Sequence, residues 1–249
     1  MDDRRIVLVD ELRGFAIICM VIYHLLFSLI FIYSIDLGSS TSQIMFALQP
    51  FGAGLFILIA GFSSCYSKSN IKRGFIVLTF GLVITILTFL FIPEQVIYFG
   101  ILHFLGISIL IYELIKNIFR NANPVVFTII LTIIFILTFN LQRGFLSLPL
   151  LGSITMPREL YTSVLLAPIG FPPDTFVSAD YFPLFPWFVL FLIGTVLGNL
   201  TKQKSCPEFC YRKHLPVFSS IGRYSLIIYI LHQPVIYALL WVMKQIYII

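Results

Sequence analysis

The sequence has very little charge. Of its 249 residues, 11% are charged and 59% are hydrophobic, whereas a soluble domain carries about 25% charged residues. So few polar side chains cannot cover a water-soluble globule, which excludes a soluble fold for most of the chain. Lipid is therefore the expected solvent around it, and we predict a multi-pass protein of the cell membrane.

Cysteine is also scarce, with four residues that give no disulfide framework. Cys206, Cys210 and His214 are spaced by four, which would place three potential ligands on one face of a helix. A structural zinc site usually needs four ligands in recognised spacings. No metal site is predicted, and an ordinary cytoplasmic loop is the expected structure here.

Long apolar runs fill most of the chain. They cover residues 6–33, 43–66, 74–92, 96–118, 124–141, 180–200 and 217–247. A spanning helix needs about 20 apolar residues, so we predict an all-α polytopic membrane protein of about seven transmembrane helices. Residues 1–249 would form a single transmembrane domain. The last run contains Pro234, which leaves open whether it is one helix or a broken one.

Every second break between these runs is rich in basic residues. They precede the first run and lie in or beside the second, fourth and sixth breaks, for example at Lys72, Lys116 and Lys202. The first and third breaks have none. By the positive-inside rule this pattern predicts a cytoplasmic N-terminus. The rule also explains the formal net charge of +5, so no nucleic-acid partner is predicted.

Ionisable residues inside spans are costly and are functional candidates. In the first run, Arg13 and His24 are eleven positions apart, so they share a helix face within about 20° and lie about 16 Å apart along the axis. Asp10 precedes Arg13 by three and is expected to pair with it. Each residue alone could have a structural role, the arginine by snorkelling to the interface and the histidine by packing on a neighbouring helix. The three residues together on one face favour a functional role.

Four ionisable residues of the other runs are further candidates. The predicted topology places His103 and Asp180 near the outer side, where they could meet His24 in one pocket. Arg223 lies toward the cytoplasm. His232 lies nearer the midplane, and for it we favour an interhelical hydrogen bond over a catalytic role.

This layout has a chemical logic. A histidine of near-neutral pKa can take a proton from a hydroxyl or amine, or can carry an acyl group itself. Arginine binds phosphate well. Arg13, held by Asp10, and Arg223 would therefore face a cytoplasmic donor, and His24, with Asp180 and His103, would face the acceptor.

Four segments carry a family resemblance. They are Val9-Asp10-Glu11-Leu12-Arg13-Gly14-Phe15-Ala16 continuing to Met20-Val21 and His24, then residues 98–106 (YFGILHFLG), residues 180–187 (DYFPLFPW), and residues 222–226 (GRYSL) continuing to 231–234 (LHQP). In this order they resemble the bacterial branch of the heparan-alpha-glucosaminide N-acetyltransferase-like family. The spacing of Arg13 and His24 is also similar to the acyltransferase-3 group of the same superfamily, in which that pair is regarded as essential.

The resemblance implies a transmembrane acyltransferase that uses cytosolic acetyl-CoA. We therefore expect an enzyme that moves an acetyl group to a hydroxyl or amine of an extracytoplasmic glycan or amino sugar. Many relatives have ten or more spans, so the resemblance indicates the reaction class more than the acceptor. The alternative is a small transporter or substrate-binding membrane protein without catalysis. The sequence leaves open whether the acyl group is first carried by a histidine or is transferred directly. It also leaves the oligomeric state open.

Overall fold

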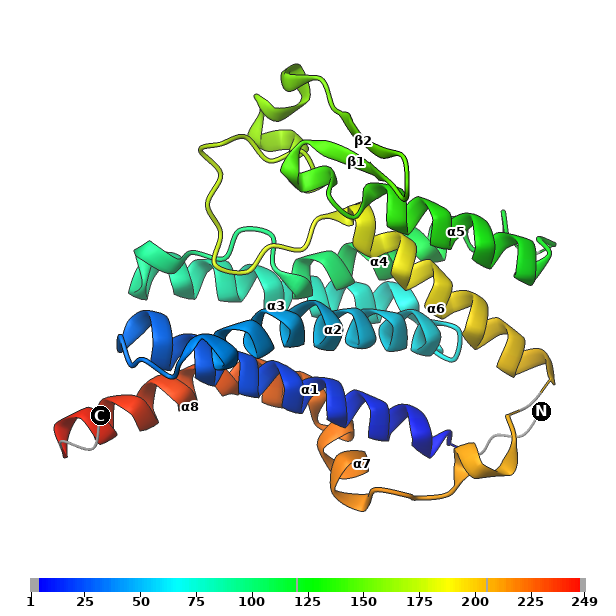
Figure 1. Ribbon diagram of the computed structural model, residues 1–249. Coiled ribbons are helices and arrows are strands. Elements are labelled where there is room, and N and C mark those ends of the chain that lie inside the picture. The colour runs from blue at the N-terminus through cyan, green and yellow to red at the C-terminus, as the bar shows by residue number, and fades with distance from the viewer. Residues whose placement is uncertain (1–4, 120, 205, 247–249) are drawn as a thin grey trace. The chain divides into compact units, whose positions relative to one another are not determined.

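The computed structural model describes residues 5–119, 121–204 and 206–246 (Figure 1). The fold is all-α as predicted, with 71% of residues helical. The helices are α1 (Val7–Phe27), α2 (Ser39–Ser64), α3 (Asn70–Phe91), α4 (Ile101–Ile115), α5 (Pro124–Thr138), α6 (Leu184–Lys204), α7 (Pro216–Arg223) and α8 (Ser225–Gln245), with a short hairpin of β1 (Phe145–Leu148) and β2 (Gly152–Thr155).

The long helices are suited to a membrane. Within the described ranges, six helical segments are long and apolar enough to cross one: Val7–Ile32, Ser39–Ser64, Asn70–Phe91, Pro124–Arg143, Leu184–Lys204 and Ser225–Gln245. The helix from the fourth apolar run, α4, is apolar but has only 15 residues. The polytopic membrane fold is thus confirmed with six long helices and one short one, while the cytoplasmic N-terminus stays a prediction.

The surface of α3 is that of a helix in lipid. Its large apolar side chains are exposed, with Phe89 59%, Leu90 64% and Phe91 76% accessible. Soluble proteins rarely expose contiguous apolar surface on this scale, because water would have to cover it. Hydrocarbon chains are the solvent that this face fits.

The chain forms two compact units. The first contains residues up to Ile59 together with those from Lys204 onward, and the second contains Ala60–Gln203. Helix α2 passes from one unit to the other along the chain. His24 belongs to the first unit, and His103 and Asp180 belong to the second. The single transmembrane domain stays a prediction.

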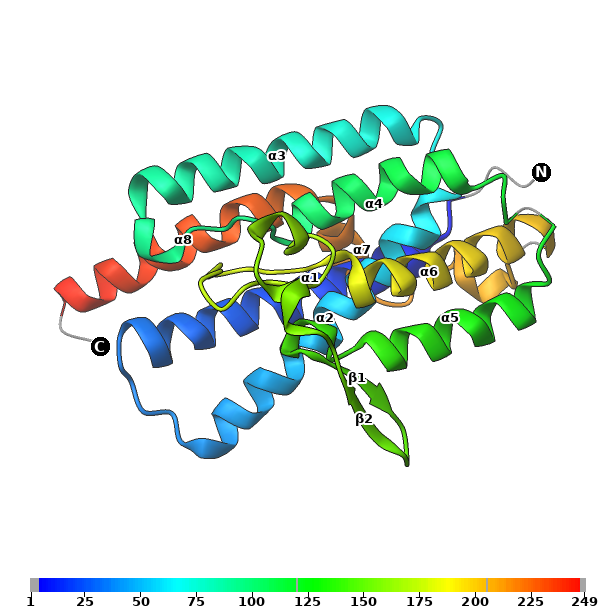
Figure 2. The same cartoon turned by 90° about the horizontal axis from the view of Figure 1, so that it is seen from above.

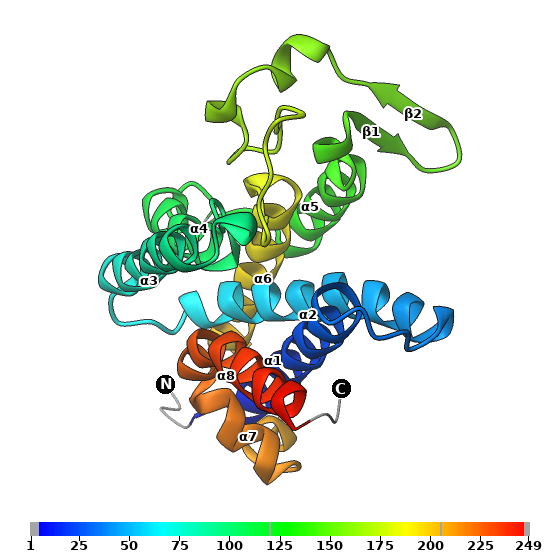
Figure 3. The ribbon, with the colours of Figure 1, turned by 90° about the vertical axis from the view of Figure 1, so that its left-hand side faces the viewer.

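In the first unit, α7 packs closely on α1 (Figure 3). Two glycines make this approach possible. A Cβ atom on Gly14 would lie 2.0 Å from the carbonyl oxygen of Phe218, and one on Gly222 would lie 1.8 Å from the carbonyl oxygen of Asp10. The backbones of the two helices therefore touch directly, with no side chain between them.

The last apolar run is divided at a different place from the one that the sequence suggested. The non-helical backbone of Tyr224, with φ −101° and ψ 16°, separates α7 from α8. Pro234 lies inside α8, which continues through it to Gln245. A proline is tolerated within a membrane helix where neighbouring groups satisfy the freed backbone. The break instead follows the end of the segment that packs on α1.

In the second unit, α3 and α4 lie side by side along their length (Figure 2). Glycines again permit the contact, because a Cβ on Gly81 would lie 3.0 Å from the backbone nitrogen of His103 and one on Gly106 would lie 2.8 Å from that of Leu78. A Cβ on Gly61 would lie 2.0 Å from the carbonyl oxygen of Phe191 in α6. Small residues at such positions are typical of membrane helix packing.

The hairpin β1–β2 was not predicted from the sequence. It lies in the long fifth break, where Phe145 pairs with Thr155 and Leu148 with Gly152 in antiparallel register. Two 3₁₀ turns follow at Arg158–Tyr161 and Val164–Leu166. β1 is half-buried and β2 exposed along its whole length, so neither four-residue strand shows the alternation by which a strand is recognised in sequence.

We expect Gly222→Ala to destabilise the protein by about 1–3 kcal/mol, the usual cost of overpacking. The added methyl group would overlap the carbonyl of Asp10 and push α7 off α1. Thermal unfolding of the purified protein in detergent measures the effect. Ser220→Ala is the matched control, because this exposed residue of α7 should change stability by less than about 0.5 kcal/mol. Equal melting temperatures for both variants would contradict the close contact.

Candidate active site

A buried carboxylate lies among three guanidinium groups near the start of α1. Asp10 is only 3% exposed. Arg5 donates from Nε to Oδ2 at 2.5 Å, and Arg13 donates from Nη1 to Oδ1 at 3.2 Å. Nε of Arg223 in α7 lies 3.9 Å from Oδ2. The predicted pairing of Asp10 with Arg13 is present, and two further arginines join it.

These four groups carry a net positive charge. One carboxylate faces three cations, so the surplus is two charges at the cytoplasmic end predicted for α1. The hydrogen bond that Arg5 donates to Asp10 raises the pKa of the Arg5 guanidinium. Arg5 and Arg223 are about half exposed, whereas the side chain of Arg13 is 20% exposed. An anion arriving from this end would meet the two exposed guanidinium groups first, and a role in donor binding stays a prediction.

The neighbouring carboxylate has a structural role that sequence reasoning did not assign. Glu11 is 4% exposed, and its Oε1 accepts backbone N–H groups of His214 and Leu215 at 2.7 and 2.8 Å. These donors lie directly before Pro216, where α7 begins. Adjacent carboxylates of α1 thus hold both ends of α7, Glu11 at the start and Asp10 at Arg223.

His24 lies against a second imidazole. Its ring centroid is 4.8 Å from that of His232 in α8, with an angle of 53° between the planes. The sequence favoured an interhelical hydrogen bond for His232. In the structure the hydrogen bond of its Nδ1 is with the carbonyl oxygen of Tyr229, within α8, and the interhelical contact is with the His24 ring.

The hydrogen bond of His232 determines where its proton lies. A carbonyl oxygen only accepts, so Nδ1 must donate to Tyr229 and therefore carries the proton. In the neutral ring Nε2 is then an unprotonated acceptor. Nε2 is buried and has no hydrogen-bond partner among the described residues. A buried basic nitrogen next to His24 is available to take part in proton transfer.

His103 has a similarly defined tautomer. It is 4% exposed in α4, and its Nε2 lies 3.1 Å from Oγ1 of Thr85. Because that hydroxyl donates to the carbonyl oxygen of Ile97 at 2.5 Å, it accepts from His103, which places the proton on Nε2. Nδ1 is left buried without a hydrogen-bond partner in the part of the chain that the structure describes.

Asp180 holds the start of α4. Its Oδ2 accepts the backbone N–H of Ile101 at 3.0 Å, across a sequence separation of 79 residues. A carboxylate at this position satisfies an orphan donor and complements the positive end of the helix dipole. The same segment is tied down at Tyr181, whose hydroxyl donates to the carbonyl oxygen of Ala167 at 2.6 Å and whose pKa is raised by burial.

The structure brings the predicted residues together in two groups. Asp10, Arg13 and Arg223 meet in the first unit, which also contains His24. Asp180 binds the first turn of the helix that carries His103 in the second unit. The convergence of all three acceptor-side residues on one pocket stays a prediction. The contacts of Glu11 with His214 and of His232 with His24 were not predicted, since they join segments about 200 residues apart.

The fold and these polar groups define a multi-pass membrane protein with arginine and histidine side chains in and beside its apolar helices. A family model described as heparan-alpha-glucosaminide N-acetyltransferase, catalytic, matches residues 5–234. The chain belongs to this family, which confirms the resemblance and implies transferase activity. No curated protein and no solved structure matches the chain.

Replacing Asp10 should destabilise the first unit. Asp10→Asn removes the carboxylate charge that pairs with Arg5, Arg13 and Arg223, at a cost of about 3 kcal/mol, the lower end for a broken buried ion pair because two of the arginines can hydrate. Denaturant or thermal unfolding in detergent measures this loss. Glu94→Gln, which neutralises an exposed carboxylate, is the control. Unchanged stability of Asp10→Asn would mean that the cluster does not hold α7 on α1.

Proposed function

We propose that the protein is an acetyltransferase of the cell membrane that moves an acetyl group from cytosolic acetyl-CoA to a hydroxyl or amine of an extracytoplasmic glycan. The match of residues 5–234 to the catalytic family model carries this proposal. The contact between the His24 and His232 rings and the arginine cluster around Asp10 support it, because they supply a proton acceptor and cationic groups.

His24 is the proposed proton acceptor. The acceptor O–H or N–H attacks the acetyl carbonyl, a C–O or C–N bond forms, and the C–S bond of the thioester breaks. His24 takes the proton from the attacking group and returns it to the departing thiolate. His232 lies beside it with an unprotonated Nε2, so the second ring can receive this proton or hold the first ring in place.

The remaining predicted residues have positioning roles in this proposal. Arg13, fixed by Asp10, and Arg223 attract the anionic donor to the predicted cytoplasmic end. His103 and Asp180 lie on the acceptor side, where Asp180 also fixes the first turn of α4. Two routes fit a single imidazole, namely direct transfer and an acetyl-histidine intermediate. A burst of free coenzyme A without acceptor distinguishes them, because only the second route releases thiol before the acceptor binds.

Purified protein incubated with acetyl-CoA labelled in the acetyl group and a panel of sugars tests the reaction. We expect labelled sugar to accumulate together with free thiol. A transporter or a binding protein without catalysis needs no thioester donor. If acetyl-CoA is neither bound nor consumed with any acceptor, the enzymatic function is wrong.

His24→Ala should lower the rate of acetyl transfer by at least about 10²-fold, the usual contribution of a general base. Its melting temperature in detergent should stay near that of the unchanged protein, so that lost activity reports lost chemistry. His214→Ala is the matched control, because His214 lies in an exposed loop. Undiminished transfer by a folded His24→Ala variant would remove this residue from the mechanism.

A further inference from the structure

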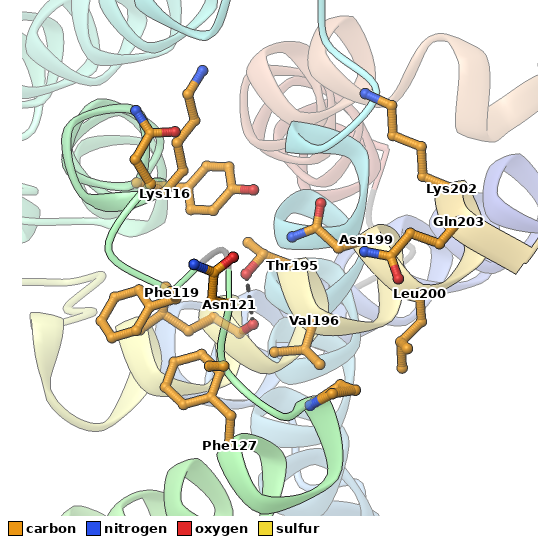
Figure 4. Close-up of a pocket in the computed structure, with 15 residues that line it drawn as sticks. Lys116, Phe119, Asn121, Phe127, Thr195, Val196, Asn199, Leu200, Lys202 and Gln203 are labelled. Atoms are coloured by element: carbon orange, nitrogen blue, oxygen red, sulfur yellow. Dashed lines mark hydrogen bonds between the residues drawn. The ribbon is translucent and has the colours of Figure 1, made fainter.

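A pocket opens in the second unit where α4 and α6 end and α5 begins. Its volume of about 540 Å³ falls within the range of about 300–1,000 Å³ that is typical of small-molecule sites. Figure 4 shows Lys116 and Lys202 on opposite sides of it, with Asn199 between them and Phe119 and Phe127 along one wall.

The charge of the lining is positive. It contains two lysines, and none of the lining residues is acidic. Nζ of Lys116 is paired with Oε1 of Glu113 at 2.5 Å, so its charge is largely compensated. Nζ of Lys202 donates to the carbonyl oxygen of Cys65 at 3.2 Å. Since that acceptor is uncharged, Lys202 keeps its positive charge for an anion in the pocket.

The rest of the lining provides amides and a stacked pair of aromatic rings. Asn121 and Asn199 each offer both a donor and an acceptor. The rings of Phe119 and Phe127 are stacked, with centroids 4.7 Å apart and planes at 21°. A heteroaromatic base can stack on such a wall and hydrogen-bond to amides at its edge, while a lysine binds phosphate.

We propose that this pocket binds a phosphorylated purine nucleotide, with the base against the phenylalanine wall and the phosphates at Lys202. If the proposed function holds, this nucleotide is the 3′-phospho-ADP end of coenzyme A. The class of ligand follows from the lining, and its identity as part of the acetyl donor rests on that function. Lys116 and Lys202 lie in breaks predicted to be cytoplasmic, the side from which such a donor comes.

A simpler role for the lysines must be separated from this one. Lys116 is the C-cap residue of α4, and Lys202 lies in the last turn of α6. Cations at these positions stabilise the negative end of a helix dipole whether or not a ligand binds. That role affects stability and leaves nucleotide affinity unchanged, so binding measurements distinguish the two.

Titration calorimetry of the full chain in detergent with 3′-phospho-ADP tests the site directly. We expect Lys202→Gln to weaken binding about tenfold, the effect of losing one charge-assisted contact. Lys204→Gln is the matched control, because it removes the same charge from α6 at a residue that does not line the pocket. Phe119→Leu should weaken nucleotide binding and leave the weaker binding of inorganic pyrophosphate unchanged.

Kinetics relate the site to acetyl transfer. For Lys202→Gln the KM for acetyl-CoA should rise about tenfold, while the KM for S-acetylpantetheine, which lacks the nucleotide, should stay the same. Three results would overturn the proposed site. The nucleotide does not bind, Lys202→Gln and Lys204→Gln have equal effects, or pyrophosphate binds as tightly as the nucleotide. Nucleotide binding that behaves as expected without transfer to any acceptor would uphold the site and refute the proposed function.

Discussion

The buried carboxylate of Asp10 is the constraint on which the first unit depends. A charge that is 3% exposed can persist in a membrane protein only when other charges and hydrogen bonds replace its hydration. Arg5, Arg13 and Arg223 provide that replacement from both sides of the α1–α7 contact. The two helices can approach so closely because Gly14 and Gly222 lack side chains there. The ion pairs and the close backbone contact therefore hold the same two helices together. The residues in contact are more than 200 positions apart in the chain.

The helices could be predicted from the sequence because the lipid environment requires them. In hydrocarbon every backbone polar group must be satisfied within the segment, so long apolar runs become helices, and the fixed geometry of a helix placed Asp10 next to Arg13. Contacts between distant segments carry no comparable rule. Arg223 beside Asp10, Glu11 at the start of α7, and the break at Tyr224 all depend on how α7 packs. The lysines and asparagines of the pocket look, in sequence, like the ordinary polar ends of spans.

The two histidines of the first unit illustrate the same limit. His24 could be identified because it shares a helix face with Arg13, whereas His232 is one polar residue in a long apolar run. Their contact at 4.8 Å gives the second residue its significance. The contact joins α1 to α8, and the hydrogen bond to Tyr229 leaves Nε2 of His232 as an acceptor beside it.

Helix α4 has a consequence for the thickness of the barrier between the two sides of the membrane. Its 15 residues rise about 22 Å, less than the hydrocarbon thickness of about 30 Å. A short span draws polar groups and water inward or thins the bilayer locally. Here one end carries the carboxylate of Asp180 and the other borders the pocket at Lys116. The second unit thus has polar groups at both ends of α4, and the apolar layer along this helix is thinner than the hydrocarbon core of a bilayer.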